Sequence, residues 1–182
     1  MEFINPKKIF GLGTGSTVNF LIHKIHETYI LKGQPINAVS TSSETTSLAT
    51  SLGINIVALD QVDELDVVID GADEVDTENN LIKGGGGALL MEKIVASCSK
   101  QFIIIVDPSK IVSKLGKFPL PVEVVQFGSE RIKEAIERFL ITLGYQMPKV
   151  TFRKSATNKY VTDQNNHILD LHLKHVPGFC VF

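Results

Sequence analysis

The side chains best suited to chemistry gather in one stretch of the chain, residues 65–97. The candidates in this stretch are two aspartates, a lysine, four consecutive glycines and a glutamate: Asp70, Asp73, Lys83, Gly84, Gly85, Gly86, Gly87 and Glu92. A glycine run before a helix lets backbone N–H groups and the helix N-terminus face a ligand closely, so this surface suits an anion. The run alone would fit a flexible surface loop equally well. The convergent charges favour a site, because a loop that needs only flexibility has no use for them.

The elements on either side place these charges at the end of a strand. Residues 65–69 form a short, β-branched and mostly apolar run, which predicts a buried parallel strand. Asp70 and Gly71 form a turn signal directly after it. Asp70 and Asp73 are therefore expected at the carboxyl end of the strand, where open α/β sheets bind ligands. Residues 88–97 have the pattern of a helix, and Glu92 lies on it.

A second glycine loop, residues 11–17, also follows a predicted strand and precedes a predicted helix. It is not a dinucleotide fingerprint, which needs glycine in place of Ser16 and an acidic residue after the next strand. It is not a Walker loop either, since it lacks Gly-Lys-Ser/Thr. A tight turn between strand and helix is one explanation. The other is a site for a single phosphate, formed by backbone N–H groups and hydroxyls of Gly13, Thr14, Gly15, Ser16 and Thr17.

Short apolar strands alternate with helices along the first part of the chain. They are predicted at residues 8–12, 36–40, 54–57, 65–69 and 101–106. This alternation predicts a parallel sheet covered by helices on both faces. Polar turns at Ser42 and Lys110 also follow strands, and we expect them to converge with the 11–17 glycine loop at one edge of the sheet. By default, Ser42 would cap the helix that follows it.

A connector with two prolines, residues 117–121, marks a predicted domain boundary. We predict a catalytic α/β domain over residues 1–120 and a small α+β domain over residues 121–182, with the extreme C-terminus returning to the first domain. The small domain is expected to contain a strand, a helix and two further strands, at residues 122–126, 129–143, 151–152 and 168–173. Gln164, Asn165 and Asn166 suit a hairpin turn between the last two strands.

Composition limits the classes of partner. The 182 residues are 43% hydrophobic and 21% charged, the formal net charge is −2, and no Lys/Arg block indicates nucleic-acid binding. Cys98 and Cys180 are too few for a disulfide framework or a zinc site, and the five histidines form no ligand set, so we expect no metal. No leader-like segment or membrane-spanning run is present, which predicts a cytoplasmic protein without membrane contact.

Six motifs, in chain order, closely resemble the type A family of ribose-5-phosphate isomerases. They are GLGTGST, VSTSSETT, DGADEVD, LIKGGGGALLMEKI, DPSK and LGKFPLPVEV. The combination of DGADE with KGGGGAL and the following Glu-Lys is highly specific, whereas GTGST alone is not. The resemblance extends from about Phe10 to about Leu171. It implies a Rossmann-like domain with a small ferredoxin-like domain, an assembly of two or four identical subunits, and a role in the pentose phosphate pathway.

The resemblance also implies the site residues. Motif by motif, the catalytic positions of the family fall on Asp70, Asp73, Lys83 and Glu92. The contacts to phosphate and sugar fall on residues 13–17, Ser42, Lys83 and Lys110, and we add Gly84, Gly85, Gly86 and Gly87 as substrate contacts. The implied partner is a small sugar phosphate, and the implied chemistry needs no cofactor.

An aldose–ketose isomerase moves a proton from the carbon beside the carbonyl to the neighbouring carbon through an enediolate. A carboxylate with a pKa raised toward the working pH can do this, and Glu92 is the candidate, about one and a half turns into its predicted helix. Asp70 and Asp73 would bind sugar hydroxyls, and Lys83 would stabilise the oxyanion. A solvated Glu92 paired with a lysine is the structural alternative. A non-catalytic sugar-phosphate sensor, an amino-sugar phosphate deaminase and a coenzyme A transferase are the functional ones.

The chain departs from the family pattern at both ends. Members usually begin with another helix, which contributes a lysine near the site, whereas this chain opens a few residues before its first strand. Members also continue past a Pro-Gly-Val type segment into a final strand, whereas this chain ends at Phe182 soon after Val176-Pro177-Gly178. We interpret the sequence as a fragment or a shortened member that keeps all four catalytic positions.

Overall fold

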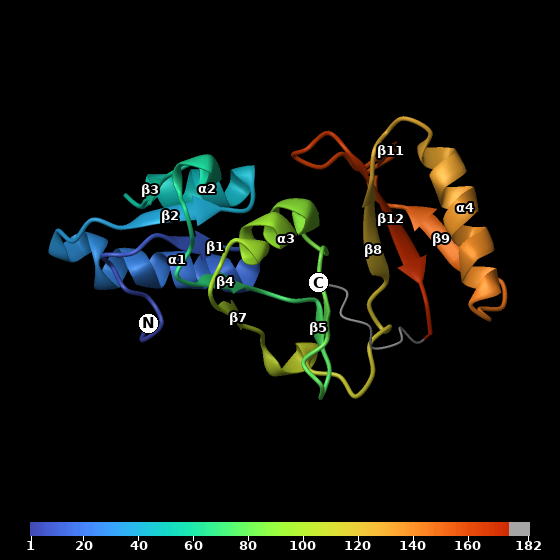
Figure 1. The fold of residues 1–182 in the computed structure, drawn as a ribbon, viewed down its shortest axis with the longest axis horizontal. Helices are drawn as coiled ribbons and strands as arrows, with labels where there is room; N and C mark the ends of the chain where they lie inside the picture. Colours follow the sequence, from blue (N-terminus) through green and yellow to red (C-terminus); the bar gives the residue numbers. More distant parts are fainter. Residues whose placement is uncertain (175–182) are drawn as a thin grey trace. The chain divides into compact units, whose positions relative to one another are not determined.

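The computed structural model describes residues 1–174, and it divides into two compact units (Figure 1). The first unit contains residues 1–71 and 88–107, and the second contains residues 72–87 and the chain from Pro108 onward. This division differs from the predicted domains in residues 72–87 and 108–120. The two units are defined by the contacts between residues and not by which segments fold independently. The predicted domain boundary after residue 120 therefore stays a prediction. The predicted return of the C-terminus concerns residues 175–182, which lie outside the described residues.

The first unit is built on a sheet of five parallel strands, in the spatial order β3-β2-β1-β4-β7. The strands are β1 (Phe10–Leu12), β2 (Asn37–Ser40), β3 (Asn55–Ile56), β4 (Val68–Asp70) and β7 (Phe102–Ile104). The order runs outward from β1 on one side and then resumes on its other side, as in Rossmann-like sheets. The predicted parallel sheet is confirmed, although the strands are shorter than predicted. Leu65, for example, makes only an isolated bridge with Ser99 ahead of β4.

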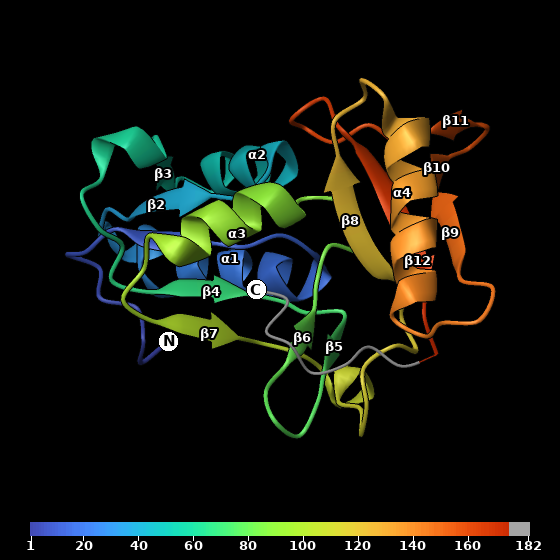
Figure 2. The same ribbon diagram turned by 45° about the vertical axis from the view of Figure 1, so that its right-hand side comes forward.

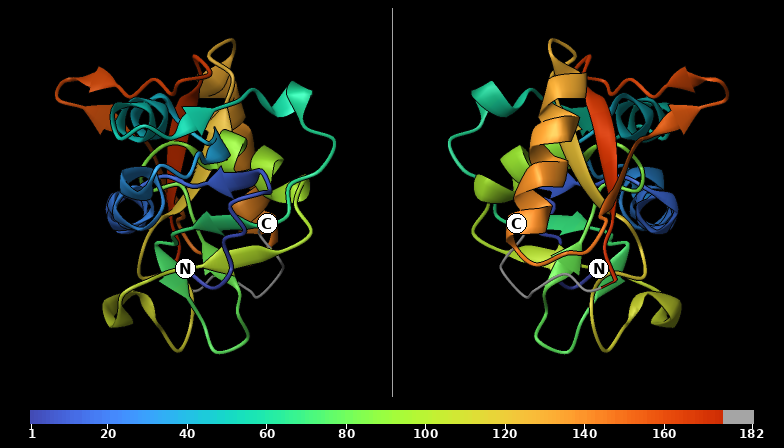
Figure 3. Two further views of the ribbon diagram at one scale, coloured as in Figure 1. Left: turned by 90° about the vertical axis from the view of Figure 1, so that its left-hand side faces the viewer. Right: turned by 90° about the vertical axis from the view of Figure 1, so that its right-hand side faces the viewer.

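Helices cover both faces of this sheet. They are α1 (Ser16–Thr28), α2 (Ser43–Ser51) and α3 (Leu89–Ser97). Alternate residues of a strand point to opposite faces of the sheet. Phe10 and Leu12 of β1 point to the face covered by α1 and α2 and join the core there. Val68 of β4 points to the other face and packs with Val95 of α3. The left view of Figure 3 shows α1 and α2, in blue and teal, on one side of the sheet and α3, in yellow-green, on the other.

Gly11 allows α3 to approach the sheet. A Cβ atom at this position would lie 2.5 Å from Cγ2 of Val68 and 2.9 Å from Cγ1 of Val95. Both distances are shorter than van der Waals contact, so a larger residue would push the helix away from β1. One glycine of the 11–17 loop is therefore explained by helix packing.

The second unit contains a sheet of three antiparallel strands, in the order β8-β12-β9. The strands are β8 (Leu120–Val124), β9 (Lys149–Phe152) and β12 (His167–His172), and α4 (Ser129–Thr142) covers one face (Figure 2). The helix buries Leu140 against Val150 and Leu169 of the sheet. A helix after the first strand, with the third strand in the middle, is the βαββ part of a ferredoxin-like fold, so the predicted α+β unit is confirmed.

Two short hairpins were missed by the sequence-based prediction. The first joins β5 (Glu74–Val75) to β6 (Leu81–Ile82), between the predicted strand at residues 65–69 and the predicted helix at residues 88–97. The second joins β10 (Lys154–Ser155) to β11 (Asn158–Lys159) and follows β9. The turn at residues 162–166 forms as predicted, with Asn165 at φ 58°. It does not connect β9 directly to β12, because the β10–β11 hairpin lies between them in the chain.

Glu74 attaches the proline-containing connector to the β5–β6 hairpin. Its side chain is 3% exposed and accepts hydrogen bonds from the backbone N–H groups of Gly116, at 2.8 Å, and Phe118, at 2.6 Å. A buried carboxylate needs such donors to offset its desolvation. This acidic residue of the DGADE motif therefore has a structural role. Within residues 1–174, no helix has the length and apolar character needed to cross a membrane.

Candidate functional site

The carboxyl ends of β1 and β4 meet where the strand order of the sheet reverses, which is the usual ligand position in such folds. Asp70, the last residue of β4, is fully buried there. Its Oδ1 accepts hydrogen bonds from the N–H groups of Thr14, at 3.2 Å, and Gly71, at 2.7 Å. A Cβ atom on Gly13 would lie 1.9 Å from the same oxygen. Residue 13 must therefore be glycine for Asp70 to occupy its place.

A cluster of hydroxyl groups joins the 11–17 glycine loop to the start of α2. The Oγ1 atom of Thr14 lies 2.8 Å from Oγ1 of Thr41 and 2.9 Å from Oγ of Ser42. Thr45 donates to the carbonyl oxygen of Gly13 at 2.9 Å. Sequence reasoning named Thr14 and Ser42 but missed Thr41 and Thr45. The hydroxyls of the VSTSSETT motif were the signal that could have indicated them.

Two helices begin beside this hydroxyl cluster. The side chain of Ser42 accepts a hydrogen bond from the N–H of Thr45 at 3.1 Å, so its predicted capping role is confirmed. α1 begins after Gly15, whose φ is 118° and which offers no side chain to cap the helix. Helix N-termini carry partial positive charge, so this end of the sheet suits an anion such as phosphate.

Glu92 is 4% exposed and lies in the first turn of α3. Its N–H donates to the carbonyl oxygen of Ala88 at 2.9 Å, the first hydrogen bond of the helix. The expected position about one and a half turns into the helix is thus wrong, because α3 begins at Leu89 and Glu92 is its fourth residue. Burial disfavours the charged carboxylate and the helix N-terminus favours it. A solvated surface role for Glu92 is excluded by its burial.

The 84–87 glycine loop belongs to the second unit, and its N–H groups are partly used within that unit. Gly85 donates to Oδ2 of Asp73 at 2.7 Å, and Gly87 donates to the carbonyl oxygen of Gly84 at 3.0 Å. The expectation that these glycines turn their N–H groups to a ligand is therefore wrong for Gly85 and Gly87. Gly84 and Gly87 have φ values of 102° and 83°, which favour glycine. Lys83, directly before the loop, is 6% exposed.

The predicted site residues fall into two groups. The first unit brings Asp70, residues 13–17 and Ser42 together, and it also carries Glu92. The second unit brings Asp73 to Gly85, with Lys83 beside them in the chain. Lys110 lies in the 3-10 helix η3 (Pro108–Lys110) of the second unit. The first unit ends at Asp107, so the expected convergence of Lys110 with the 11–17 loop stays a prediction.

Sequence reasoning missed Arg153, whose guanidinium group donates to the carbonyl oxygens of Gly84 and Gly85. The residue follows β9, far along the chain from the loop that it contacts, and none of the six motifs contains it. Within residues 1–174, no three histidine, cysteine or acidic side chains lie close enough together to hold a metal ion.

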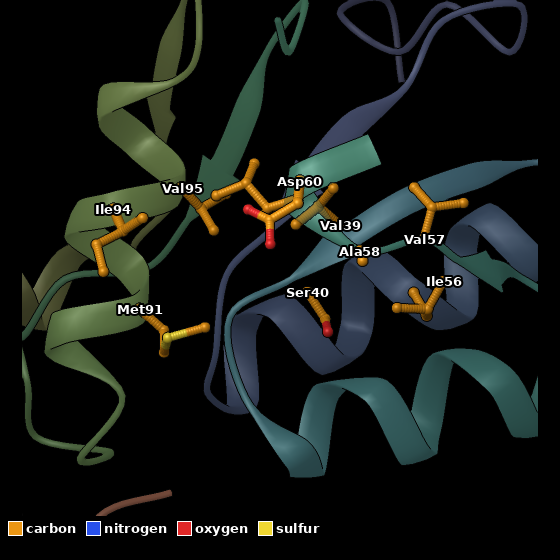
Figure 4. A pocket seen from close by; sticks show the side chains of 10 residues that line it. Val39, Ser40, Ile56, Val57, Ala58, Asp60, Met91, Ile94 and Val95 are labelled. Atoms are coloured by element: carbon orange, nitrogen blue, oxygen red, sulfur yellow. The ribbon is translucent and has the colours of Figure 1, made fainter. Parts of the chain in front are cut away.

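A pocket of 470 Å³ lies elsewhere in the first unit, between α3 and the ends of β2 and β3 (Figure 4). It is mainly apolar and is lined by Val39, Ser40, Ile56, Val57, Ala58, Leu59, Asp60, Met91, Ile94 and Val95. None of the predicted site residues is among them. The pocket is therefore separate from the residues of the candidate site.

The family model described as ribose 5-phosphate isomerase A (phosphoriboisomerase A) matches residues 37–178. The chain belongs to the ribose 5-phosphate isomerase A family. It is 49% identical over 181 residues to the ribose-5-phosphate isomerase A of Streptococcus pneumoniae (strain Hungary19A-6), covering all of this chain and 77% of the relative. The enzyme of the same name from Streptococcus uberis is 49% identical over 173 residues, which cover 95% of this chain and 74% of the relative.

Solved structures of the ribose 5-phosphate isomerase A family have the same fold. The enzyme from Plasmodium falciparum superposes with a TM-score of 0.88 at 36% identity, covering 96% of this chain and 74% of that one. A D-ribose-5-phosphate isomerase in complex with phospho-erythronic acid gives 0.87 at 38% identity, covering 97% and 76%. The predicted fold class and the expectation of an isomerase are thus confirmed, and the relatives are named as enzymes rather than as sensors or deaminases.

Proposed function

We propose that this chain interconverts ribose 5-phosphate and ribulose 5-phosphate, with Glu92 as the proton-transferring base. The observation that carries the proposal is the burial of Glu92, a carboxylate 4% exposed in the first turn of α3. Glutamates are seldom so buried, because desolvation of the charge is costly, and the other buried glutamate within residues 1–174, Glu74, is held in a structural role by two backbone N–H groups. A general base benefits from the same environment, which brings its proton affinity closer to that of the reacting carbon acid.

The base moves one proton between neighbouring carbons. Glu92 removes the proton from carbon 2 of the open-chain aldose, and the electron pair moves to the carbonyl oxygen to give an enediolate. The carboxylic acid then returns the proton to carbon 1 while the oxygen on carbon 2 becomes the ketone. Nothing is oxidised or reduced overall, so the reaction needs no redox cofactor.

The other three residues handle the oxygens. Asp70 and Asp73 bind sugar hydroxyls, and they also exchange protons with the two oxygens of the enediolate. Each aspartate is held by backbone N–H groups, Asp70 by Thr14 and Gly71 and Asp73 by Gly85, which keeps its carboxylate in one orientation. Lys83 stabilises the negative charge that develops on the oxygen of carbon 1.

The phosphate of the substrate binds at residues 13–17 and Ser42, with Lys110 as a further contact. The hydroxyl cluster around Thr14 and the uncapped start of α1 support this part of the proposal. The phosphorylated ligand in the structural neighbour shows that a relative accepts the same kind of group. From the family we also infer two or four identical subunits, a cytoplasmic location and a role in the non-oxidative pentose phosphate pathway.

The direct test is to incubate the protein with ribose 5-phosphate in D₂O and to follow the products by NMR. Formation of ribulose 5-phosphate with deuterium at carbon 1 is expected, because the proton on Glu92 can exchange with solvent before it returns. Activity should survive chelation of divalent ions, and free ribose should react far more slowly, since it lacks the binding energy of the phosphate. Binding without turnover would identify a sensor instead.

A further inference from the structure

We propose that Arg153 is a positioning residue, which orients Lys83 and Asp73 by holding the 84–87 glycine loop. The inference rests on the proposed function in one respect, the catalytic roles of Lys83 and Asp73. All of these residues belong to the second unit, so the contacts that carry the argument lie within one compact body.

Asp170 fixes the guanidinium group of Arg153. The Nε atom of Arg153 donates to Oδ2 of Asp170 at 3.1 Å, and Nη2 donates to Oδ1 at 2.6 Å. The two side chains are only 14% and 16% exposed. Asp170 itself lies on β12, the middle strand of the sheet, with β8 and β9 on either side. This bidentate, mostly buried ion pair with a residue of the central strand fixes the position of the guanidinium group.

The remaining end of the same group holds the loop. Nη1 of Arg153 donates to the carbonyl oxygen of Gly84 at 2.6 Å and to that of Gly85 at 3.0 Å. One side chain thereby connects the sheet to two consecutive peptide groups. A lysine has a single ammonium on a flexible stem and cannot replace the planar fork that makes both connections at once.

Lys83 is thereby held on both sides. Before it, Ile82 pairs with Glu74 across the β5–β6 hairpin, and its carbonyl oxygen accepts from the N–H of Asp73 at 2.8 Å. After it, Gly84 is held by Arg153. The chain between these two points is too short for the backbone of Lys83 to move independently of them.

Asp73 is linked to the same clamp. Its carboxylate accepts the N–H of Gly85 at 2.7 Å, and the carbonyl oxygen of Gly85 accepts from Arg153. Loss of the arginine would let the loop move and would change both catalytic groups together. A misplacement of about 1 Å can cost on the order of 10²-fold in rate.

The test compares Arg153→Ala and Arg153→Lys with Arg131→Ala, which removes an exposed arginine from α4 of the same unit. Each variant is measured for kcat, KM and melting temperature. We expect Arg153→Ala to lower kcat by about 10²-fold, with a smaller change in KM, and Arg131→Ala to leave both unchanged. Arg153→Lys keeps a charge beside Asp170, so it should fold yet still lose kcat. A lysine variant with the parent's kcat would overturn the proposal, because a positive charge at position 153 would then be sufficient without the hydrogen bonds of the guanidinium group to the loop.

Two further measurements separate positioning from stability. Combining Arg153→Ala with Lys83→Ala should lower kcat by less than the product of the two separate losses, since the part of the arginine's effect that acts through Lys83 is already gone in Lys83→Ala. Fully multiplicative losses would contradict the proposal. Hydrogen exchange at the Gly85 amide should accelerate in Arg153→Lys and not in Arg131→Ala. That readout needs no turnover. Unchanged exchange in Arg153→Lys would therefore contradict the positioning role of Arg153 even if the parent protein proved inactive. An inactive parent would refute the proposed function instead.

Discussion

Single residues decide whether the carboxylates of this protein can occupy their places. Asp70 is fully buried at the end of β4, and it fits only because residue 13 has no side chain. Glu92 is buried in the first turn of α3. Glycine at position 13 is therefore as necessary to the proposed chemistry as the aspartate beside it.

Gly13→Ala is expected to abolish most of the activity. The added Cβ would lie 1.9 Å from Oδ1 of Asp70, so the carboxylate must leave its position between the N–H groups of Thr14 and Gly71. The loss in kcat should be about 10²-fold or more, as for other misplaced catalytic groups. Steady-state kinetics on the purified variant measure it.

Gly71→Ala is the matched control. A Cβ at this neighbouring position would meet only the carbonyl oxygens of Ile105, at 3.8 Å, and Thr14, at 4.0 Å, which are ordinary contacts. The control should fold and keep Asp70 in place. Equal activity in the two alanine variants would mean that Asp70 does not need the position seen here.

At the scale of elements, hydroxyl groups join the 11–17 glycine loop to the start of α2. Ser42→Ala removes the cap of α2 and one member of this cluster. We expect a stability loss of about 1 kcal/mol from the cap and a higher KM for ribose 5-phosphate. Ser47→Ala removes an exposed hydroxyl from the same helix and serves as the control. An equal KM for ribose 5-phosphate in the two variants would show that Ser42 does not contribute to phosphate binding.

The β5–β6 hairpin is expected to loosen in acid. The side chain of Asn80 and the N–H groups of Asn80 and Glu78 donate to the carboxylate of Asp76, which lowers the pKa of Asp76 below its ordinary value of 3.8. A lowered folded-state pKa means that this stabilisation is complete above the ordinary value and is lost as pH falls through the lowered one.

Amide hydrogen exchange in the hairpin measures this effect as a function of pH. Protection relative to other strands should fall in the parent as pH drops below 3.8, and Asp76→Asn should show low protection that does not vary with pH in that range. A parent hairpin whose relative protection stays constant there would contradict the role of Asp76.

The sequence predicted the elements with long apolar patterns and missed those without them. The five parallel strands lie in mainly apolar runs of the sequence and α4 has apolar residues at helical spacing, whereas β5, β6, β10 and β11 are two-residue strands outside such runs. Asn79 and Ala156, both at positive φ, mark their turns, but only the asparagine is a usual turn residue. Arg153 was missed because its partners, Gly84 and Asp170, are brought to it only by folding.

On the scale of the whole molecule, the four predicted catalytic residues are divided equally between the two units. Asp70 and Glu92 belong to the first, and Asp73 and Lys83 to the second. The division falls inside the most specific motif, between Gly71 and Ala72. The assignment of all four residues to one reaction therefore depends on the family match, which spans both units.

The central claim, that Glu92 is the base, is tested most directly by Glu92→Gln. The amide keeps the shape of the side chain but cannot accept the proton, so turnover and deuterium exchange should fall by about 10²- to 10⁴-fold while binding of ribose 5-phosphate persists. Glu44→Gln, an exposed glutamate in the first turn of α2, is the control and should behave like the parent. A Glu92→Gln variant that isomerises ribose 5-phosphate within a few-fold of the parent rate would contradict the account.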